Sequence, residues 1–157
     1  MNSQPAEMTI RPIGIVRSPV KQRQHPGYAW QQVEAEIVID DSLTEDLEGL
    51  EGFSHLIVIY RLHLATDKAR MASRVHPRGE KDLPLVGRLA TRSPYRPNSL
   101  GQKVVRLVER QGNVLKVRGL DALDGTPVID IKPYIPGYDS VDDATVPPWT
   151  HHHHHRR

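Results

Sequence analysis

Short runs in which apolar and polar residues alternate recur along the chain, separated by proline, glycine and charged residues. Alternation with a period of two is typical of a strand with one buried face. It predicts strands at residues 9–16, 33–39, 86–90, 104–108, 114–117 and 128–131. The most apolar stretch, residues 53–63, is rich in β-branched residues, which favours a central strand over a helix.

The sequence between these runs predicts one short helix and one tight hairpin. Ser42 is followed three residues later by Glu45, a capping-box pattern that predicts a helix over residues 42–50. Residues 111–113, Gln-Gly-Asn, separate two predicted strands and predict a hairpin. A glycine-rich turn from strand to helix is missing, so the pattern disfavours a dinucleotide-binding fold. The predicted class is all-β, mainly antiparallel and barrel-like.

The composition is that of one globular domain. The chain has 157 residues, of which 38% are apolar and 25% are charged. No run reaches the roughly 18 apolar residues of a membrane-spanning helix, and the first residues do not resemble a secretory signal. Because cysteine is absent, the sequence excludes disulfides and thiol catalysis. We expect a cytoplasmic protein without a membrane partner.

The last seven residues distort the charge balance. Five histidines at 151–155 precede Arg156 and Arg157, and this segment is interpreted as a tag or a disordered tail. Without these two arginines, 19 of the 21 basic residues remain, which equals the 19 acidic ones. Bulk charge therefore gives no argument for nucleic acid, and such a partner must be argued from local patches.

Two arginines in a proline-stiffened loop are the clearest candidates for ligand binding. Arg92 and Arg96 lie four residues apart, and Pro94 and Pro97 restrict the backbone between and after them. Rigid guanidinium groups suit a carboxylate or a phosphate, which they bind through two parallel hydrogen bonds. The alternative is a pair of solvated loop arginines. The histidines before the tail lack metal-ligand spacing, and no serine lies in a Gly-x-Ser-x-Gly setting.

A cluster of aspartates near the end of the domain leaves two interpretations open. Asp124 precedes Gly125 in a turn dipeptide, so turn capping and ligand binding are equally open for it. For Asp121, ligand binding is favoured over capping.

Four segments together resemble one family. They are IGIVRSP at residues 13–19, GLEGFSHL at 49–56, ATRS-x-x-RPN-x-x-G at 90–101 and LDGTPVIDIKPY at 123–134. In this order they resemble the TsaA-like family, also called YaeB or TrmO, over residues 10 to 136. Characterised members are S-adenosylmethionine-dependent tRNA methyltransferases that methylate the exocyclic nitrogen of threonylcarbamoyladenosine beside the anticodon.

The resemblance implies a single-sheeted β-barrel that acts as a homodimer, with S-adenosyl-L-methionine near the subunit interface. It divides the chain into a tail at 1–9, a barrel domain at 10–138, an extension at 139–150 and the final tail at 151–157. Carried onto this sequence, the cofactor-binding residues are Arg23, Gln24, His63, Leu64, Arg92, Gln102, Arg118, Gly119, Leu120 and Asp121.

The family's chemistry suggests a role for several of these residues. Arg92 or Arg23 would pair with the methionyl carboxylate, and Asp121 would accept hydrogen bonds from the ribose hydroxyls or the amino group. The catalytic candidates are His63 and Tyr95, either of which would remove or orient the proton of the attacking nitrogen. For His63, the alternative is a strand-end histidine bonded to backbone.

The sequence departs from the family at two loops and in length. Ser99 replaces a proline of the family's RPNP, and Gln22 stands where the family has proline, which leaves the register of residues 21–27 open by one. The bacterial enzymes carry a further C-terminal domain after the matched region. If that domain holds tRNA, the cofactor site is kept while the acceptor differs.

The sequence leaves three alternative functions for the protein. The first is a methyltransferase acting on modified tRNA, helped by a basic loop that carries Arg70, Arg74, His76, Arg78 and Lys81. A solvated loop balanced by Glu80 and Asp82 is the alternative interpretation of that segment. The second function is methylation of a small metabolite or a protein. The third is a non-catalytic module that binds the cofactor or a related nucleoside.

Overall fold

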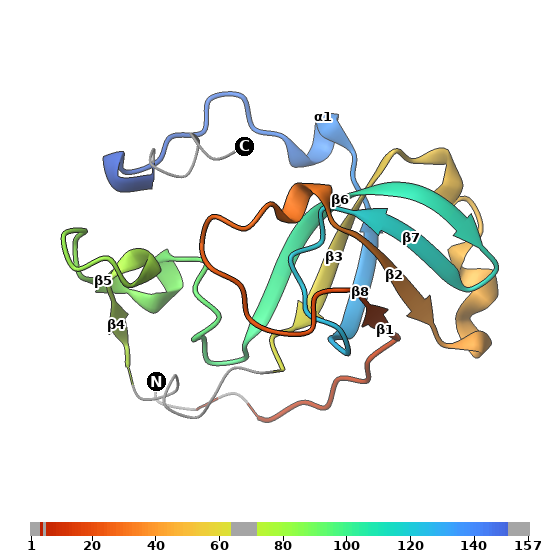
Figure 1. Cartoon of the computed structure of the whole chain (residues 1–157), viewed down its shortest axis with the longest axis horizontal. Helices are drawn as coiled ribbons and strands as arrows, with labels where there is room; N and C mark the ends of the chain where they lie inside the picture. The colour runs from red at the N-terminus through yellow and green to blue at the C-terminus, as the bar shows by residue number, and fades with distance from the viewer. Residues whose placement is uncertain (1–3, 5, 64–71, 151–157) are drawn as a thin grey trace.

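A closed antiparallel barrel forms the body of the computed structural model, which describes residues 4, 6–63 and 72–150 (Figure 1). Its strands are β1 (Gly14–Arg17), β2 (Glu34–Ile39), β3 (His55–Arg61), β6 (Leu100–Gln111), β7 (Val114–Arg118) and β8 (Pro127–Pro133). They follow one another around the ring in the order β1-β2-β7-β6-β3-β8. The predicted all-β, single-sheeted barrel is confirmed.

Strict alternation of side chains fills the barrel. In β2, Ala35, Ile37 and Ile39 are buried while Glu34 and Glu36 face solvent. The other strands contribute Val16, Leu56, Val58, Tyr60, Val105, Leu115, Val117 and Val128 to the same core. The hydrophobic pattern read from the sequence therefore selects the inner face of each strand.

Several predicted strand boundaries are wrong. The first strand begins at Gly14, not residue 9, since Pro12 has no N–H to donate to a neighbouring strand. Gly14 itself permits the approach of β2, because a Cβ there would lie 2.5 Å from the Val38 carbonyl oxygen. β6 starts at Leu100, four residues before the predicted strand.

Between β3 and β6 the chain leaves the barrel. The excursion carries a two-stranded ribbon of β4 (Arg74–Val75) and β5 (Val86–Gly87). The strand predicted over residues 86–90 stops at Gly87, and residues 88–90 form the 3-10 turn η6 (Arg88–Ala90) instead. In Figure 1 the ribbon stands apart from the barrel, to its left.

The helices among the described residues are short, from three to seven residues each. They are η1 (Trp30–Gln32), η2 (Asp41–Leu47), η3 (Leu50–Gly52), η5 (Pro77–Gly79), η6 and α1 (Pro136–Asp139). The single helix predicted over residues 42–50 is wrong: the segment forms η2 and then η3. The cap is Asp40 rather than Ser42, because the Asp40 Oδ1 accepts hydrogen bonds from the Ser42 N–H at 2.9 Å and its hydroxyl at 2.7 Å.

Strand direction brings certain chain segments to one end of the barrel. Because every neighbouring pair is antiparallel, β1, β3 and β7 end where β2, β6 and β8 begin. We call this end the mouth. Loops that enter or leave it are held by rigid strands, a common arrangement for binding residues.

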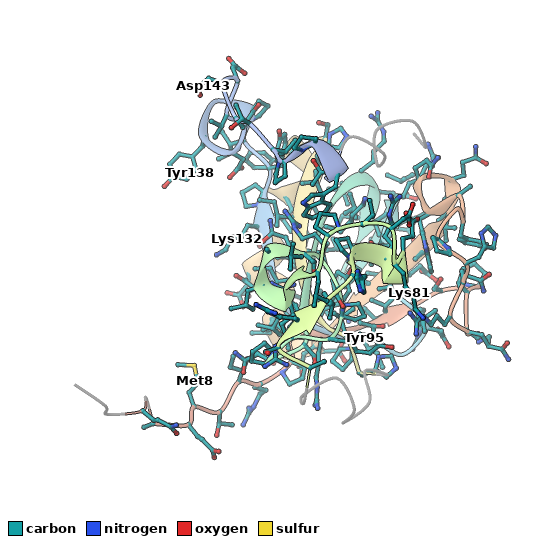
Figure 2. All side chains as sticks on the ribbon, turned by 90° about the vertical axis from the view of Figure 1, so that its left-hand side faces the viewer. Met8, Lys81, Tyr95, Lys132, Tyr138 and Asp143 are labelled. Carbon is teal, nitrogen blue, oxygen red and sulfur yellow. The ribbon has the colours of Figure 1, made fainter. Side chains whose placement is uncertain are left out.

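The last described residues extend away from the barrel. After α1 the chain runs along the top of Figure 1 to the upper left, above β5, and Figure 2 shows Tyr138 of α1 and Asp143 of the following segment projecting outward. Tyr138 is 86% exposed. No helix among residues 4, 6–63 and 72–150 has the length and apolarity needed to cross a membrane.

Candidate functional site

The predicted site residues lie on segments that border the mouth. They come from the loop after β1 (Arg23, Gln24), the end of β3 (His63), the segment before β6 (Arg92, Tyr95), the start of β6 (Gln102), and the end of β7 with the loop after it (Arg118, Gly119, Leu120, Asp121). Leu64 lies outside the described residues. Segments far apart in the sequence therefore reach one end of the barrel.

Two of these segments are in direct contact. The Arg23 guanidinium donates a hydrogen bond of 3.1 Å to the Tyr95 hydroxyl. Its central carbon also lies 6.0 Å from the centre of the Tyr95 ring, at the limit of a cation–π contact. The loop after β1 is thereby joined to the loop before β6, and Figure 2 shows Tyr95 on the face nearest the viewer.

The two arginines of the proline-stiffened loop differ in their interactions. Arg96 donates to the carbonyl oxygen of Thr91 at 2.5 Å and lies 3.4 Å from that of Ser93, so it holds the loop together. Arg92 is exposed, and no hydrogen bond or ion pair joins its side chain to another described residue. Arg96 therefore has a structural contact within the loop, whereas the Arg92 guanidinium has no hydrogen bond or ion pair to another described residue.

Ser99 has a backbone conformation that proline cannot adopt. Its φ is 48°, while the proline ring fixes φ near −65°. Its carbonyl oxygen accepts a 2.7 Å hydrogen bond from the Leu62 N–H, one residue before His63. The substitution at this position thus accompanies a local turn that ties the loop before β6 to the end of β3.

His63 contacts a buried hydroxyl. Its Nδ1 lies 3.4 Å from the Thr126 Oγ1, and that hydroxyl donates to the Leu123 carbonyl oxygen at 2.6 Å. Since a hydroxyl has one proton, Thr126 acts as the acceptor toward His63. With Nδ1 as the donor in this long contact, the neutral form of the imidazole presents Nε2 as its proton acceptor.

Asp121 is held by a residue that the sequence did not indicate as functional. The Tyr60 hydroxyl donates a 2.5 Å hydrogen bond to the Asp121 Oδ1. Burial, and then the nearby Asp121 carboxylate, raise the pKa of Tyr60 well above its usual value, so the phenol remains a donor. The one available signal was the inward position of Tyr60 in β3, because a buried tyrosine hydroxyl needs a partner.

Asp124 stabilises a turn. Its Oδ1 accepts a 2.9 Å hydrogen bond from the Ser18 N–H, and its Oδ2 pairs with the Lys21 ammonium at 3.1 Å. These two interactions, the Ser18 hydrogen bond first, lower the pKa of Asp124. Of the two interpretations that the sequence left open, turn capping is confirmed.

Asp124→Asn is expected to lower the melting temperature by a few degrees at pH 7, because the neutral amide loses the Lys21 pair and weakens the Ser18 bond. The folded-state pKa is depressed, so this stabilisation is present above the unfolded value near 3.8 and is lost as the pH falls through the folded-state pKa. Melting curves from pH 7 down to 2.5 should therefore converge. An equal difference at every pH would contradict this, and Asp142→Asn on the exposed extension is the control.

The remaining candidates have internal contacts of their own. The Arg118 guanidinium pairs with Glu34 at 2.7 Å, which with Lys116 lowers the pKa of Glu34. Gln24 donates to the Gln22 carbonyl oxygen at 2.9 Å, and Gln102 lies opposite Ile59 on the neighbouring strand. Because the Arg118 side chain is paired with Glu34, the structure favours contact with the cofactor through the backbone of the loop after Arg118.

Two hollows lie near the loop after β1. The larger, about 880 Å³, is lined by alternating opposite charges such as Glu36 and Lys116, and none of the predicted cofactor residues lines it. The smaller, about 310 Å³, lies between Pro19 and Tyr28 and includes Gln24. Because the larger groove is mixed in charge and two ion pairs, Lys21–Asp124 and Lys116–Glu34, lie within its lining, the smaller one agrees better with the predicted site.

The fold and the mouth define a class: a closed antiparallel barrel that presents candidate binding residues from several loops at one end. Residues 15–140 match the family described as the tRNA-methyltransferase O N-terminal domain, and the chain belongs to that family. The resemblance inferred from the four segments is confirmed.

Two named relatives illustrate the similarity. A protein of Methanothermobacter thermautotrophicus named "Probable S-adenosyl-L-methionine-binding protein" is 48% identical over 86% of this chain and 96% of its own length. The tRNA (adenine(37)-N6)-methyltransferase of Escherichia coli is 35% identical over 85% of this chain and 60% of its own length.

The solved structure of TrmO from Pseudomonas aeruginosa superposes with a TM-score of 0.69 at 33% identity, covering 89% of this chain and 62% of that one. This chain therefore spans about three fifths of the length of the named tRNA methyltransferases, and nearly all of the archaeal cofactor-binding relative.

Proposed function

We propose that the protein is an S-adenosyl-L-methionine-dependent methyltransferase whose acceptor is the exocyclic nitrogen of threonylcarbamoyladenosine beside the tRNA anticodon. The observation that carries the proposal is the gathering of the described candidate residues at one end of the barrel. The names of the relatives support both the cofactor and the substrate.

The available groups fit the cofactor. Arg92 offers an unpaired guanidinium for the methionyl carboxylate, and the Asp121 Oδ2 has no hydrogen bond to another described residue. When bound, the cofactor supplies an electrophilic methyl group. The protein must then align the acceptor nitrogen with that methyl and remove a proton from the nitrogen.

We assign the proton acceptor to His63 Nε2, with Tyr95 orienting the acceptor nitrogen through the hydroxyl that contacts Arg23. His63→Ala is expected to slow single-turnover methyl transfer roughly 100-fold, the low end for general base catalysis, with a smaller change in cofactor affinity. His55→Ala, at the start of the same strand, is the control. An unchanged rate would favour the alternative of a structural strand-end histidine.

The local distribution of charge supports binding of tRNA more than the net charge of the chain does. Arg74 and Lys81 of the excursion are exposed, and Figure 2 shows Lys81 on the same face as Tyr95. Other members of the predicted basic loop have internal partners: Arg78 lies 3.5 Å from Glu80, and His76 Nδ1 lies 2.9 Å from the Leu83 carbonyl oxygen. Arg70 lies outside the described residues. Phosphate contact therefore rests on fewer side chains than the sequence suggested.

Calorimetric titration with S-adenosyl-L-methionine, on protein without residues 151–157, is the first test. Saturable binding followed by methylation of tRNA, detected by nucleoside mass spectrometry, would support the proposal. Affinity for the acceptor that falls steeply with salt favours tRNA, and a shallow fall favours a small metabolite or a protein. Binding of the cofactor without turnover favours the non-catalytic module.

We also propose a homodimer with the cofactor near the subunit interface. Exposed apolar side chains on α1 and on the segment after it support the homodimer, because Tyr138, Val141 and Val146 expose 86%, 65% and 48% of their surface. Light scattering of the full chain tests this, and a monomer at micromolar concentration would contradict it. A cytoplasmic location and the boundaries at residues 9, 138 and 150 stay predictions.

A further inference from the structure

We propose that Tyr60 is a positioning residue for the cofactor: its buried hydroxyl fixes the Asp121 carboxylate at the mouth, so that the second oxygen accepts a hydrogen bond from the ribose or the ammonium group. The inference rests on the proposed function through the role of Asp121. It adds a residue that touches no ligand and acts through its hydrogen bond to Asp121.

The Tyr60 ring has little freedom to move. It is 3% exposed and belongs to the apolar core of the barrel. On one side it packs so closely on Gly101 that a Cβ at that glycine would lie 2.7 Å from the ring. On β8 the pairing register shifts beside it, between Ile59 and Tyr60, a local irregularity of the kind that redirects side chains near functional sites. The hydroxyl is thus held in one place.

Asp121 is restrained from the other side by its neighbours in the chain. Leu120 is fully buried and Ala122 is 3% exposed, while Asp121 between them is exposed. The backbone just before them is tied to η1, because the Gly119 N–H donates to the Val33 carbonyl oxygen at 3.0 Å. The carboxylate therefore has one oxygen on a buried phenol and the other available to a ligand.

The hydrogen bond between Tyr60 and Asp121 suits the binding of a cofactor. A carboxylate that accepts a fixed hydrogen bond at one oxygen loses rotational freedom before the ligand arrives, so less entropy is lost on binding. A ribose hydroxyl or an ammonium group is the donor that S-adenosyl-L-methionine offers.

Tyr60→Phe tests the inference, because it removes the hydroxyl and keeps the ring. Titration with S-adenosyl-L-methionine should show affinity about 10-fold weaker, the loss typical of one hydrogen bond to a charged group. The KM for tRNA should stay unchanged. Asp121→Asn, which changes the acceptor of the same hydrogen bond, should weaken binding of S-adenosyl-L-methionine at least as much. Tyr134→Phe, a tyrosine whose ring contacts His55 instead, is the matched control and should bind normally.

The double variant separates positioning from stability. If Tyr60 acts through Asp121, then Tyr60→Phe should add no further loss in an Asp121→Ala background. Full additivity, or normal affinity in Tyr60→Phe, would overturn the inference while the function stands. Absence of binding by the unmodified protein would overturn both. Repeating the titration with 5′-methylthioadenosine identifies the donor: an equal loss indicates the ribose, and a loss confined to S-adenosyl-L-methionine indicates the ammonium.

Discussion

Arg92→Ala is expected to weaken S-adenosyl-L-methionine binding by roughly 100-fold, equivalent to about 3 kcal/mol, and to leave the melting temperature unchanged. The reason lies in the contrast between two neighbours. The Arg92 side chain is exposed and has no hydrogen bond or ion pair to another described residue, whereas Arg96 donates to the Thr91 carbonyl oxygen. Calorimetric titration and thermal melting of the same samples measure both quantities.

The control for this prediction is Arg74→Ala, another exposed arginine, on β4 of the excursion. It should bind the cofactor normally. Normal cofactor binding by Arg92→Ala at unchanged stability would contradict the role of Arg92. Arg23 would then be the candidate partner of the methionyl carboxylate. Arg96→Ala is expected to differ from both, because it disrupts the loop and lowers affinity and stability together.

Gly101→Ala is expected to lower the free energy of unfolding by about 2–3 kcal/mol, at the upper end for a side chain forced into a filled core. The new methyl group would lie 2.7 Å from the Tyr60 ring, which is buried and cannot move aside. Urea unfolding followed by circular dichroism measures the change.

Gly52→Ala is the matched control, since a Cβ at residue 52 meets no atom within 4 Å and the glycine does not adopt a positive φ. A loss below about 0.5 kcal/mol in Gly101→Ala would mean that the ring relaxes freely, and the fixed position of Tyr60 would be wrong with it.

Hydrophobic alternation was enough to predict most of the barrel, because each strand buries one face. The hairpin between β6 and β7 formed at residues 111–113 as its turn residues indicate. Local pattern failed where a distant contact decides the outcome. β6 begins as early as Leu100 because it pairs with β3 up to Arg61. The sequence of residues 100–103 alone does not indicate that pairing.

The candidate site was predictable in membership and less so in roles. The matching motifs identified Arg92 and Asp121, yet spacing alone could not separate Arg92 from Arg96, since that distinction depends on which carbonyl groups the loop turns inward. For Tyr60, the sequence predicted only a place in the apolar strand over residues 53–63. Its bond to Asp121 joins residues 61 positions apart, and periodicity carries no information on such a contact.

The ring of strands is closed by the first strand and the last. β1 pairs with β8 at only two positions, Gly14 with Val128 and Ile15 with Pro127, across more than a hundred residues of chain. During synthesis, β1 must therefore wait for its second neighbour until nearly the whole domain has left the ribosome, and one of its edges stays open until then. Closure at such long range also delays folding, because loop entropy is lost before the final contacts form. The mouth lies at one end of this seam, so its ring of strands is complete only once β8 has joined β1.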